Sequence, residues 1–382
     1  MKLVVFGLSI SSSWGNGHAT LWRALCRALA ARGHRTVFFE RDVPYYAAHR
    51  DVLTPDGADL VLYDGWSRVR PHAEREVADA DVSIVTSYCP HAIAATALVA
   101  ERARASVFYD LDTPVTLDAL RRGEAVSYIG RRGLQDFDLV LSFTGGAALR
   151  ALQDTLGAKR VAPLYGSVDP AVHRPVDGMP QYRASLSYLG TYAEDRQRML
   201  ETLFVEPARA RPQQRFVIGG AAYPHDFPWT SNIHFVRHLP PSEHPAFFCS
   251  SPLTLNVTRR AMAEMGYCPS GRLFEAAACG ATILSDSWDG IEQFFTIGEE
   301  LLVAHDAGDT LAALDRGEDE LARIGRAARE RALTEHTADR RAIDFERALE
   351  LIGEDSGAAA LSSIAPGSAS DAEPWSSSEL EA

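Results

Sequence analysis

The stretch LTLNVTRRAMAEMGYCPSGRLFEAAACGATILSD, residues 253–286, decides the fold. It begins with a short apolar run, Leu253–Asn256, and ends with another, Thr282–Ser285. Between them, good helix formers fill Arg272–Cys279, small residues and a proline precede that run, and Gly280 ends it. These are the start and stop signals of a helix. A strand, a helix and a strand in this order predict a parallel sheet covered by helices.

The same alternation of apolar runs and helical patterns extends through the chain in both directions. In the first half, the predicted strands are Leu3–Leu8, Thr36–Glu40, Asp59–Tyr63, Val82–Ser87, Ser106–Tyr109, Leu139–Phe143 and Val161–Tyr165. In the second half, they are Ser187–Leu189, Arg215–Ile218, Ile233–Phe235, Leu253–Asn256, Thr282–Ser285 and Leu301–Val303. The pattern predicts the α/β class with two Rossmann-like domains.

A turn-rich stretch divides the two halves. GSVDPAVHRPVDGMP, residues 166–180, is the best linker candidate in the chain. We therefore expect an N-terminal domain at 1–172 and a C-terminal domain at 183–340. A final helix at 341–354 is expected to pack back on the N-terminal domain. Residues 355–382 are rich in Ser, Ala and Gly and predict a disordered tail.

Length and composition limit the classes of function. A chain of 382 residues is too long for one comfortable core, which agrees with two domains. A net charge of −13 argues against the broad basic surface that nucleic-acid binding needs. The cysteines are odd in number and form no C-x-x-C pair, and no apolar run approaches the roughly 18 residues of a membrane span. These features predict a cytoplasmic protein with neither a nucleic-acid partner nor stable membrane insertion.

The strongest candidate site is the start of the helix in CPSGRLFEAAACG, residues 268–280. A helix N-terminus attracts anions, and Arg272 adds a bidentate donor. No lysine occurs after residue 159, so a phosphate clamp in the second half must use arginine or backbone N–H groups. Glu275, one turn into the helix, can hydrogen-bond the diol of a ribose. The predicted nucleotide-binding residues here are Ser270, Gly271, Arg272 and Glu275.

Two other segments of the second half are candidates for the same nucleotide. Gly190 and Thr191 follow a strand and precede a helical pattern, so their N–H groups are expected to meet a phosphate. Arg196 falls in the first turns of that helix and can reach the same group. An ordinary strand–helix turn accounts for these residues equally simply. Asn256, Thr258 and Arg259 are expected to line the same cleft.

In the first half, the loop SISSSWGNGHAT, residues 9–20, joins the first strand to its helix. Gly15 and Gly17 match two glycines of G-x-G-x-x-G, but Thr20 stands in place of the third. Glu40 ends the second strand, where a dinucleotide fold has its ribose-binding acid, so an NAD-dependent oxidoreductase is the alternative function. Such a long loop is better suited to closing over a sugar or acceptor. Its acceptor-side candidates are Trp14, Gly15, Asn16 and Gly17.

Three acid–base candidates also lie in the first half. His18, at a helix start, is placed to accept a proton from an acceptor, or it is simply a helix N-terminal residue. Asp110 and Asp112 follow a strand and either orient a sugar hydroxyl, act as a base or cap a helix. No third ligand stands nearby, so the pair does not predict a metal site. Arg41, Asp42 and Tyr45 follow the end of another strand and are predicted acceptor contacts, or a solvated loop.

Taken in order, these segments resemble the group 1 glycosyltransferases of the GT-B fold, most closely their CgeB-like branch. The resemblance covers roughly residues 1–345. It is carried by SSWGNGHATLWRALCRALAARGH (12–34), PLYGSVDPAVHRP (163–175, like the family's NGVD…F-x-P stretch), PSGRLFEAAACGATILSD (269–286) and WDGIEQFF (288–295). The family has two domains facing across a cleft. It moves a sugar from a nucleotide donor on the C-terminal domain to an acceptor on the N-terminal one, without a divalent metal or further cofactor.

The resemblance also assigns roles to residues. Glu275 matches the second Glu of the family's Glu-x7-Glu motif, which binds the donor ribose, whereas Tyr267 stands at the first. The Lys of the family's usual Arg/Lys diphosphate clamp is missing, so Arg196 and Arg272 are expected to replace the pair. The implied function is a metal-independent, hexosyltransferase-type glycosyltransferase. Because of Tyr267, a non-catalytic sugar-nucleotide-binding protein is a further alternative.

Overall fold

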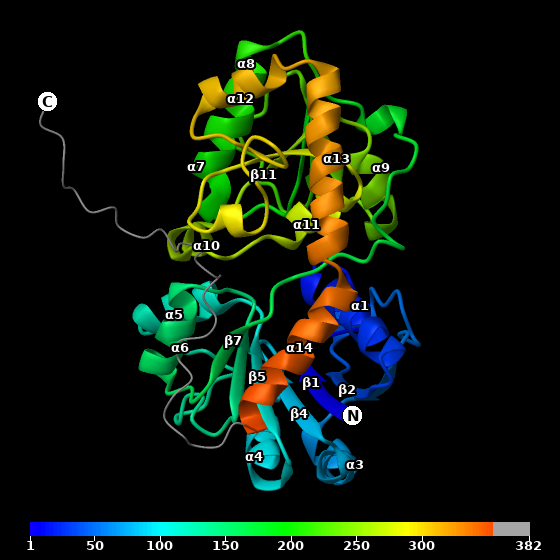
Figure 1. Ribbon diagram of the computed structural model, residues 1–382, viewed down its shortest axis with the longest axis vertical. Helices are drawn as coiled ribbons and strands as arrows, with labels where there is room; N and C mark the ends of the chain where they lie inside the picture. The colour runs from blue at the N-terminus through cyan, green and yellow to red at the C-terminus, as the bar shows by residue number, and fades with distance from the viewer. Residues whose placement is uncertain (354–382) are drawn as a thin grey trace, which may run out of the picture.

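The computed structural model describes residues 1–353, which form two α/β domains stacked one above the other in Figure 1. The N-terminal domain holds a seven-stranded sheet of order β3-β2-β1-β4-β5-β6-β7, and the C-terminal domain a six-stranded sheet of order β10-β9-β8-β11-β12-β13. All strand pairs are parallel. The prediction of two Rossmann-like domains is confirmed. The predicted tail, 355–382, lies outside the described residues.

The N-terminal sheet is built from short, buried strands alternating with helices. Its strands are β1 Lys2–Gly7, β2 Arg35–Arg41, β3 Ala58–Tyr63, β4 Val82–Thr86, β5 Ser106–Asp110, β6 Leu139–Ser142 and β7 Val161–Pro163. Its helices are α1 Gly17–Ala31, α2 Pro44–Ala47, α3 Trp66–Asp79, α4 Ala92–Arg102, α5 Thr113–Arg121 and α6 Ala147–Leu156.

The C-terminal domain repeats this plan. Its strands are β8 Leu186–Leu189, β9 Phe216–Gly220, β10 Ile233–Arg237, β11 Leu253–Asn256, β12 Thr282–Ser285 and β13 Leu302–Val303. The helices after the linker are α7 Gln197–Leu200, α8 Glu206–Ala210, α9 His244–Phe248, α10 Arg260–Met265, α11 Gly271–Ala278, α12 Ala307–Leu314, α13 Glu318–Glu335 and α14 Ala338–Gly353. Every strand predicted from the sequence is present, with ends shifted by at most two residues.

The strands have apolar residues on both faces because helices cover both faces of each sheet. On β1, Val4 and Phe6 join the core on one face of the sheet, whereas Leu3 and Val5 join the core on the other. Side chains alternate along a strand, so a strand buried on both sides needs a continuous apolar run. This is why short runs without polar alternation were good predictors of strands.

Within residues 1–353 the chain crosses between the domains twice, side by side. The N–H of Val168 donates to the carbonyl of His336 at 2.9 Å, and the N–H of Ala338 donates to the carbonyl of Val168 at 3.1 Å. After the second crossing, α14 lies along the N-terminal domain (Figure 1). Its Ala342 and Phe345 share a core with residues of α1. The last described helix therefore ties the end of the C-terminal domain to the N-terminal one.

The carboxyl ends of the two sheets meet at the domain interface. The N–H of Gly145, after β6, donates to the carbonyl of Tyr267, after β11, at 3.0 Å. The rings of Trp14, after β1, and His238, after β10, stack with centroids 4.7 Å apart. Open α/β sheets bind ligands beyond the carboxyl ends of their strands. A ligand is therefore expected at this interface.

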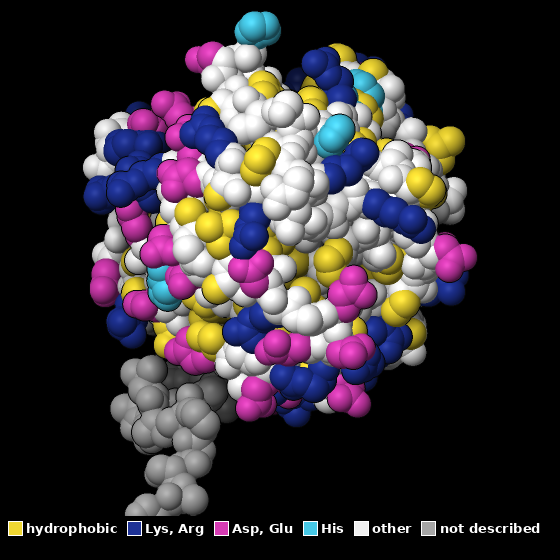
Figure 2. Space-filling model, turned by 90° about the horizontal axis from the view of Figure 1, so that it is seen from above, with side chains coloured by type: hydrophobic (Ala, Val, Ile, Leu, Met, Phe, Trp, Pro, Cys, Tyr) yellow, Lys and Arg dark blue, Asp and Glu magenta, His cyan; other side chains and the backbone are white. Residues whose placement is uncertain are grey.

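Charged side chains are mixed over the outer face of the C-terminal domain. Seen from above in Figure 2, basic and acidic side chains are interspersed there and form no broad basic surface. This agrees with the negative net charge of the chain. Within residues 1–353, no helix combines the length and the apolar character that crossing a bilayer requires.

Candidate active site

The predicted nucleotide site is built on the first turns of α11. Ser270 caps this helix, because its Oγ accepts a hydrogen bond from the N–H of Arg272 at 3.2 Å. Nη1 of Arg272 then donates to Oε2 of Glu275 at 2.5 Å. The Arg272 side chain is 40% exposed and the Glu275 side chain only 10%. The guanidinium thus stands between solvent and a buried carboxylate, at a helix start with small residues.

The Glu275 carboxylate is held in its ionised form. Burial by itself raises the pKa of this carboxyl, but the charge of Arg272, and two histidines, more than offset it and bring the pKa to about 2. Nε2 of His173 lies 3.9 Å from Oε2 of Glu275, and Nδ1 of His244 lies 4.0 Å from the same atom. An ionised carboxylate can only accept hydrogen bonds. It is therefore suited to bind hydroxyl groups such as those of a ribose.

The two histidines beside Glu275 were not among the residues predicted from sequence. His173 belongs to the linker, and His244 starts α9; both are buried. Burial lowers the pKa of His173, and burial together with Arg272 lowers the pKa of His244 to about 3, so the site favours the uncharged form of both rings. The one available signal was H-R-P at 173–175, which stands where the family pattern has F-x-P.

The spacing of this cluster also resembles a metal site. One ligand atom from each of His173, His244 and Glu275 lies within 4.8 Å of the others. However, the oxygen that faces both histidines, Oε2 of Glu275, already accepts a hydrogen bond from Arg272. A divalent cation at this point would lie beside a guanidinium and be repelled by it. We therefore treat the three residues as a polar cluster around Glu275.

The second predicted phosphate contact is partly wrong. The N–H of Gly190 donates to the carbonyl of Gly219 at 2.9 Å and is used by the sheet. The next helical turn begins only at Glu194, so neither Gly190 nor the exposed Thr191 stands at a helix start. Arg196 nevertheless reaches back to this turn, since its Nη1 lies 3.2 Å from the hydroxyl of Tyr188 and borders Gly190. Arg196 is half-buried, and its guanidinium lies beside this turn.

The predicted nucleotide contacts at the end of β11 and just after it differ in burial and in hydrogen bonding. Asn256 and Thr258 are buried, and their donors are used internally: the Asn256 amide donates to Ser285 Oγ at 3.1 Å. The N–H and Oγ1 of Thr258 both donate to the carboxylate of Asp286. These two side chains shape the loop, contrary to the expectation that they contact the nucleotide. Arg259 is more exposed, and its Nε donates to Oδ2 of Asp195, in the turn after β8, at 3.2 Å.

Tyr267 fills the position of the motif's first Glu. It has a positive φ of 49°, and its N–H donates to the carbonyl of Asp289 at 2.7 Å. Its ring lies between two glycines: a Cβ added to Gly146 would be 2.4 Å from the ring, and one added to Gly290 would be 2.5 Å from it. Gly146 belongs to the N-terminal domain and Gly290 to the C-terminal one. Tyr267 is therefore an interdomain packing residue and presents no carboxylate.

On the N-terminal side, His18 and Asp112 come together from different segments. Nε2 of His18, at the start of α1, lies 3.3 Å from Oδ2 of Asp112, which precedes α5. The ring of Tyr88 lies against His18, with centroids 5.6 Å apart. Burial and then Asp112 raise the pKa of Tyr88 to about 12, whereas Arg259 lowers it.

Asp110 has a different role from Asp112, although the sequence placed them together. Asp110 is fully buried, and its Oδ1 accepts hydrogen bonds from the N–H of Asp112 at 3.1 Å and from Oγ1 of Thr116 at 3.2 Å. Burial raises the pKa of Asp110 to about 6. The structure thus corrects the expectation of two acids facing the same way: Asp110 holds the turn in which Asp112 meets His18.

Buried side chains hold the glycine loop, residues 9–20, in place. The carboxylate of Glu40 accepts hydrogen bonds from the N–H groups of Ile10 at 2.7 Å and Ser11 at 2.9 Å, and from two serine hydroxyls of the loop. Glu40 is fully buried, so it does not offer its oxygens to a ribose. Asn16 caps α1, since its Oδ1 accepts from the N–H of His18 at 3.1 Å. Both side chains position the loop, and Asn16 is no acceptor contact.

The remaining loop residues reach the domain interface or the outer surface. The ring of Trp14 is stacked between His49, at 4.5 Å, and His238 of the C-terminal domain, at 4.7 Å. Gly15 has a positive φ of 60° and lies next to the hydroxyl of Tyr45, which is 57% exposed. Gly17 begins α1. The loop therefore brings Trp14 across to the other domain.

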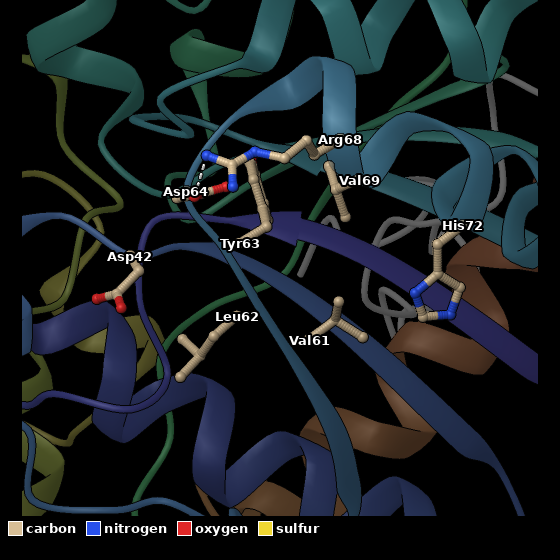
Figure 3. A pocket seen from close by; sticks show the side chains of 8 residues that line it. All are labelled: Asp42, Val61, Leu62, Tyr63, Asp64, Arg68, Val69 and His72. Carbon is tan, nitrogen blue, oxygen red and sulfur yellow. Dashed lines mark ion pairs between the residues drawn. The ribbon is translucent and has the colours of Figure 1, made fainter.

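Beyond the loop, Asp42 pairs with Arg50 at 2.7 Å, while Arg41 ends β2. Asp42 also borders an open pocket of about 490 Å³ at the edge strand β3 (Figure 3). In this pocket, Asp64 and Arg68 form an ion pair. Asp42 is the one predicted acceptor residue that this pocket includes.

Comparisons with known proteins agree with this architecture. Residues 196–347 match the family model described as Glycosyl transferase-like, which covers less than half of the chain. A search of curated proteins gives no match.

Several solved structures have the same fold. Sucrose-phosphate synthase from Thermosynechococcus elongatus superimposes with a TM-score of 0.68 at 15% identity, over 93% of this chain and 100% of that chain. The Anabaena protein HepE, solved in complex with UDP-glucose, has a TM-score of 0.63 at 12% identity, over 92% and 99% of the two chains. An alpha-glucosyltransferase in complex with UDP and a 13-mer DNA has a TM-score of 0.64 at 12% identity, over 93% and 100%. At these identities the likeness establishes the fold, which is GT-B.

Proposed function

We propose that the protein is a metal-independent glycosyltransferase, which moves a hexose from a nucleotide sugar on the C-terminal domain to an acceptor on the N-terminal domain. The observation that carries this proposal is the pairing of Arg272 with the buried, ionised Glu275 at the start of α11. The carboxylate suits the two hydroxyls of a ribose, and the guanidinium suits a diphosphate. The family match over 196–347 and the GT-B neighbours solved with UDP or UDP-glucose support it.

The leaving group gains negative charge as the bond from sugar to phosphate breaks. Arg272, the N–H groups of Ser270 and Gly271, and Arg196 supply positive charge and donors for the nucleoside diphosphate. These groups take the part that a divalent cation plays in metal-dependent transferases. The proposed reaction therefore needs neither a metal ion nor a cofactor besides its nucleotide-sugar substrate.

The acceptor proton has a recipient on the N-terminal side. We assign it to His18, whose Nε2 lies 3.3 Å from Asp112. An aspartate at this position orients the imidazole and stabilises the imidazolium that forms when the ring takes a proton. The same contact places the ring at the carboxyl end of the N-terminal sheet, where the acceptor is expected. Assignment to the CgeB-like branch stays a prediction.

One observation favours a second candidate function. Because Tyr267 occupies the place of the motif's first Glu and packs between two glycines, a protein that binds sugar nucleotides without turning them over fits the same site. The oxidoreductase alternative is disfavoured, since the carboxylate of Glu40 already accepts hydrogen bonds from the loop that it supports.

A thermal-shift screen with UDP, GDP, ADP and CDP, their hexose conjugates and NADH tests the proposal. A ligand at 100 times its Kd stabilises the fold by about 2.7 kcal/mol. We expect one diphosphate and its sugar to raise the Tm, and Glu275→Gln to abolish the rise. That sugar nucleotide should then be hydrolysed or transferred equally with and without EDTA. No response to any diphosphate, or a response to NADH alone, would overturn the proposal; binding without turnover would favour the binding protein.

A further inference from the structure

We propose that His173 is a positioning residue of the nucleotide site: it hydrogen-bonds Glu275 when the Arg272 guanidinium moves onto a bound diphosphate, and so keeps the carboxylate aimed at the ribose. This inference rests on the proposed function and adds a residue to it. No residue of the linker was assigned to the nucleotide by the sequence patterns.

The first support is the position of the His173 ring. The residue is 8% exposed, and among the described residues neither ring nitrogen has a hydrogen-bond partner. Buried polar groups are normally paired, because an unpaired one loses its hydration without compensation. Oε2 of Glu275 lies 3.9 Å from its Nε2. A shift of about 1 Å brings the two atoms to hydrogen-bond distance.

The second support is that Arg272 is expected to bind two groups, the Glu275 carboxylate and a phosphate. Its guanidinium holds Glu275 at 2.5 Å, yet its side chain is 40% exposed and is the charged group best placed to meet a phosphate. When it turns toward a diphosphate, the buried carboxylate loses its strongest partner. Leaving a buried charge unpaired is costly, so another donor must take over. His173 and His244 each have a ring nitrogen within 4.0 Å of Oε2.

His173 is the better candidate of the two because both of its ring nitrogens are buried and, among the described residues, have no hydrogen-bond partner. His244 starts α9, within the C-terminal domain. His173 also sits on the linker between the domains, so its contact with Glu275 joins the linker to the nucleotide site.

The arrangement predicts that protons are taken up on binding. Burial lowers the pKa of His173, and Arg272 lowers it further, whereas Glu275 and Asp169 raise it. Neutral His244 is the other group that faces the ring. When Arg272 leaves for the diphosphate, its lowering effect falls while that of Glu275 remains, so the pKa of His173 rises. A group whose pKa rises on binding takes up a proton, and affinity then increases as the pH falls.

Calorimetric titration of the full chain tests this inference. The probes are UDP, GDP, ADP and CDP, each with its 2′-deoxy form; the proteins are the parent, His173→Phe, His173→Gln, Glu275→Gln and, as a control at an exposed site, His225→Gln. Replacing the hydrogen-bonding ring by Phe should weaken the ribonucleotide about 10-fold, which is the loss of one hydrogen bond to a charged group. The 2′-deoxy form should lose little, so the preference for ribose shrinks. Gln can still donate and should restore most of the affinity.

The outcomes separate the two proposals. If the parent binds none of the four diphosphates, the proposed function and this inference both fall. If the parent binds and Glu275→Gln does not, but His173→Phe keeps the parent's affinity and preference for ribose, only the inference falls. If His173→Phe does not fold, the parent protein is titrated in two buffers of different ionisation enthalpy. The inference requires that these titrations reveal proton uptake on binding, and the absence of proton uptake overturns it.

Discussion

Nη1 of Arg272 lies 2.5 Å from Oε2 of Glu275, three residues further along α11. The two side chains therefore act as one unit, in which an exposed cation meets solvent and a buried anion stays charged because of it. A change at Arg272 removes the proposed phosphate contact and also disturbs the carboxylate behind it.

This pairing predicts the effect of replacing Arg272. Arg272→Ala should lower kcat/KM by roughly two to three decades, the usual cost of one charged contact to a developing anion. Arg272→Lys should recover only part, because an ammonium group keeps the charge but cannot donate in the bidentate geometry. Steady-state turnover of the nucleotide sugar measures both. Arg323→Ala, at an exposed site of α13, is the matched control, and an alanine variant with parental turnover would falsify the assignment.

Replacing His18 should affect turnover and not nucleotide binding. His18→Ala removes the proposed proton acceptor, so kcat should fall about 10²- to 10⁴-fold. Asp112→Asn keeps the shape but cannot stabilise the imidazolium, and its kcat should fall in the same direction. The affinity for the nucleoside diphosphate, measured by calorimetry, should stay within a few-fold. His305→Ala, exposed before α12, is the control; an unchanged kcat with weakened nucleotide binding would contradict the assignment.

The packing of Tyr267 against Gly146 can be tested by a double-mutant cycle. Gly146 has a positive φ of 55°, and an added Cβ would be 2.4 Å from the Tyr267 ring. Gly146→Ala should therefore destabilise the fold by about 1–3 kcal/mol through steric overlap and backbone strain. In a Tyr267→Ala background the steric part should disappear, so the loss should be smaller. Thermal melting reports both values.

Gly317→Ala is the control for that cycle, because no atom lies within 4 Å of its added Cβ and its φ is −66°. Equal losses for Gly146→Ala with and without the Tyr267 ring would show that the ring does not make the contact.

The buried Asp110 makes the stability of the fold depend on pH. Burial raises its pKa from 3.8 to about 6, so between these values the unfolded chain releases the proton first and stability falls as the pH rises. Two pKa units correspond to roughly 3 kcal/mol. Asp110→Asn does not titrate, so from pH 4 to pH 7 it should gain roughly that amount relative to the parent. Urea unfolding at several pH values measures the difference.

Asp154→Asn, at an exposed position of α6, should show no such trend relative to the parent. A difference between Asp110→Asn and the parent that stays constant from pH 4 to pH 7 would mean that Asp110 does not titrate in this range.

The fold and the start of α11 were predictable because their signals are local. A strand buried on both faces needs an uninterrupted apolar run, and a helix start needs a capping residue such as Ser270 before good helix formers. Both depend on neighbours in the chain. The wrong expectation at Gly190 shows the limit of this reasoning. A strand followed by a helical pattern suggested a free N–H, but Gly219 of the next strand takes it.

The sequence alone therefore determined two parallel sheets covered by helices, the positions of their strands, and a helix start that carries Arg272 and Glu275. Only the tertiary structure decided that His173 of the linker lies beside Glu275, that His18 meets Asp112, and that Tyr267 fills the space between glycines of different domains. These contacts join residues far apart in the chain. Their distances depend on how two folded domains and a linker pack together, which no periodicity or spacing along the chain encodes.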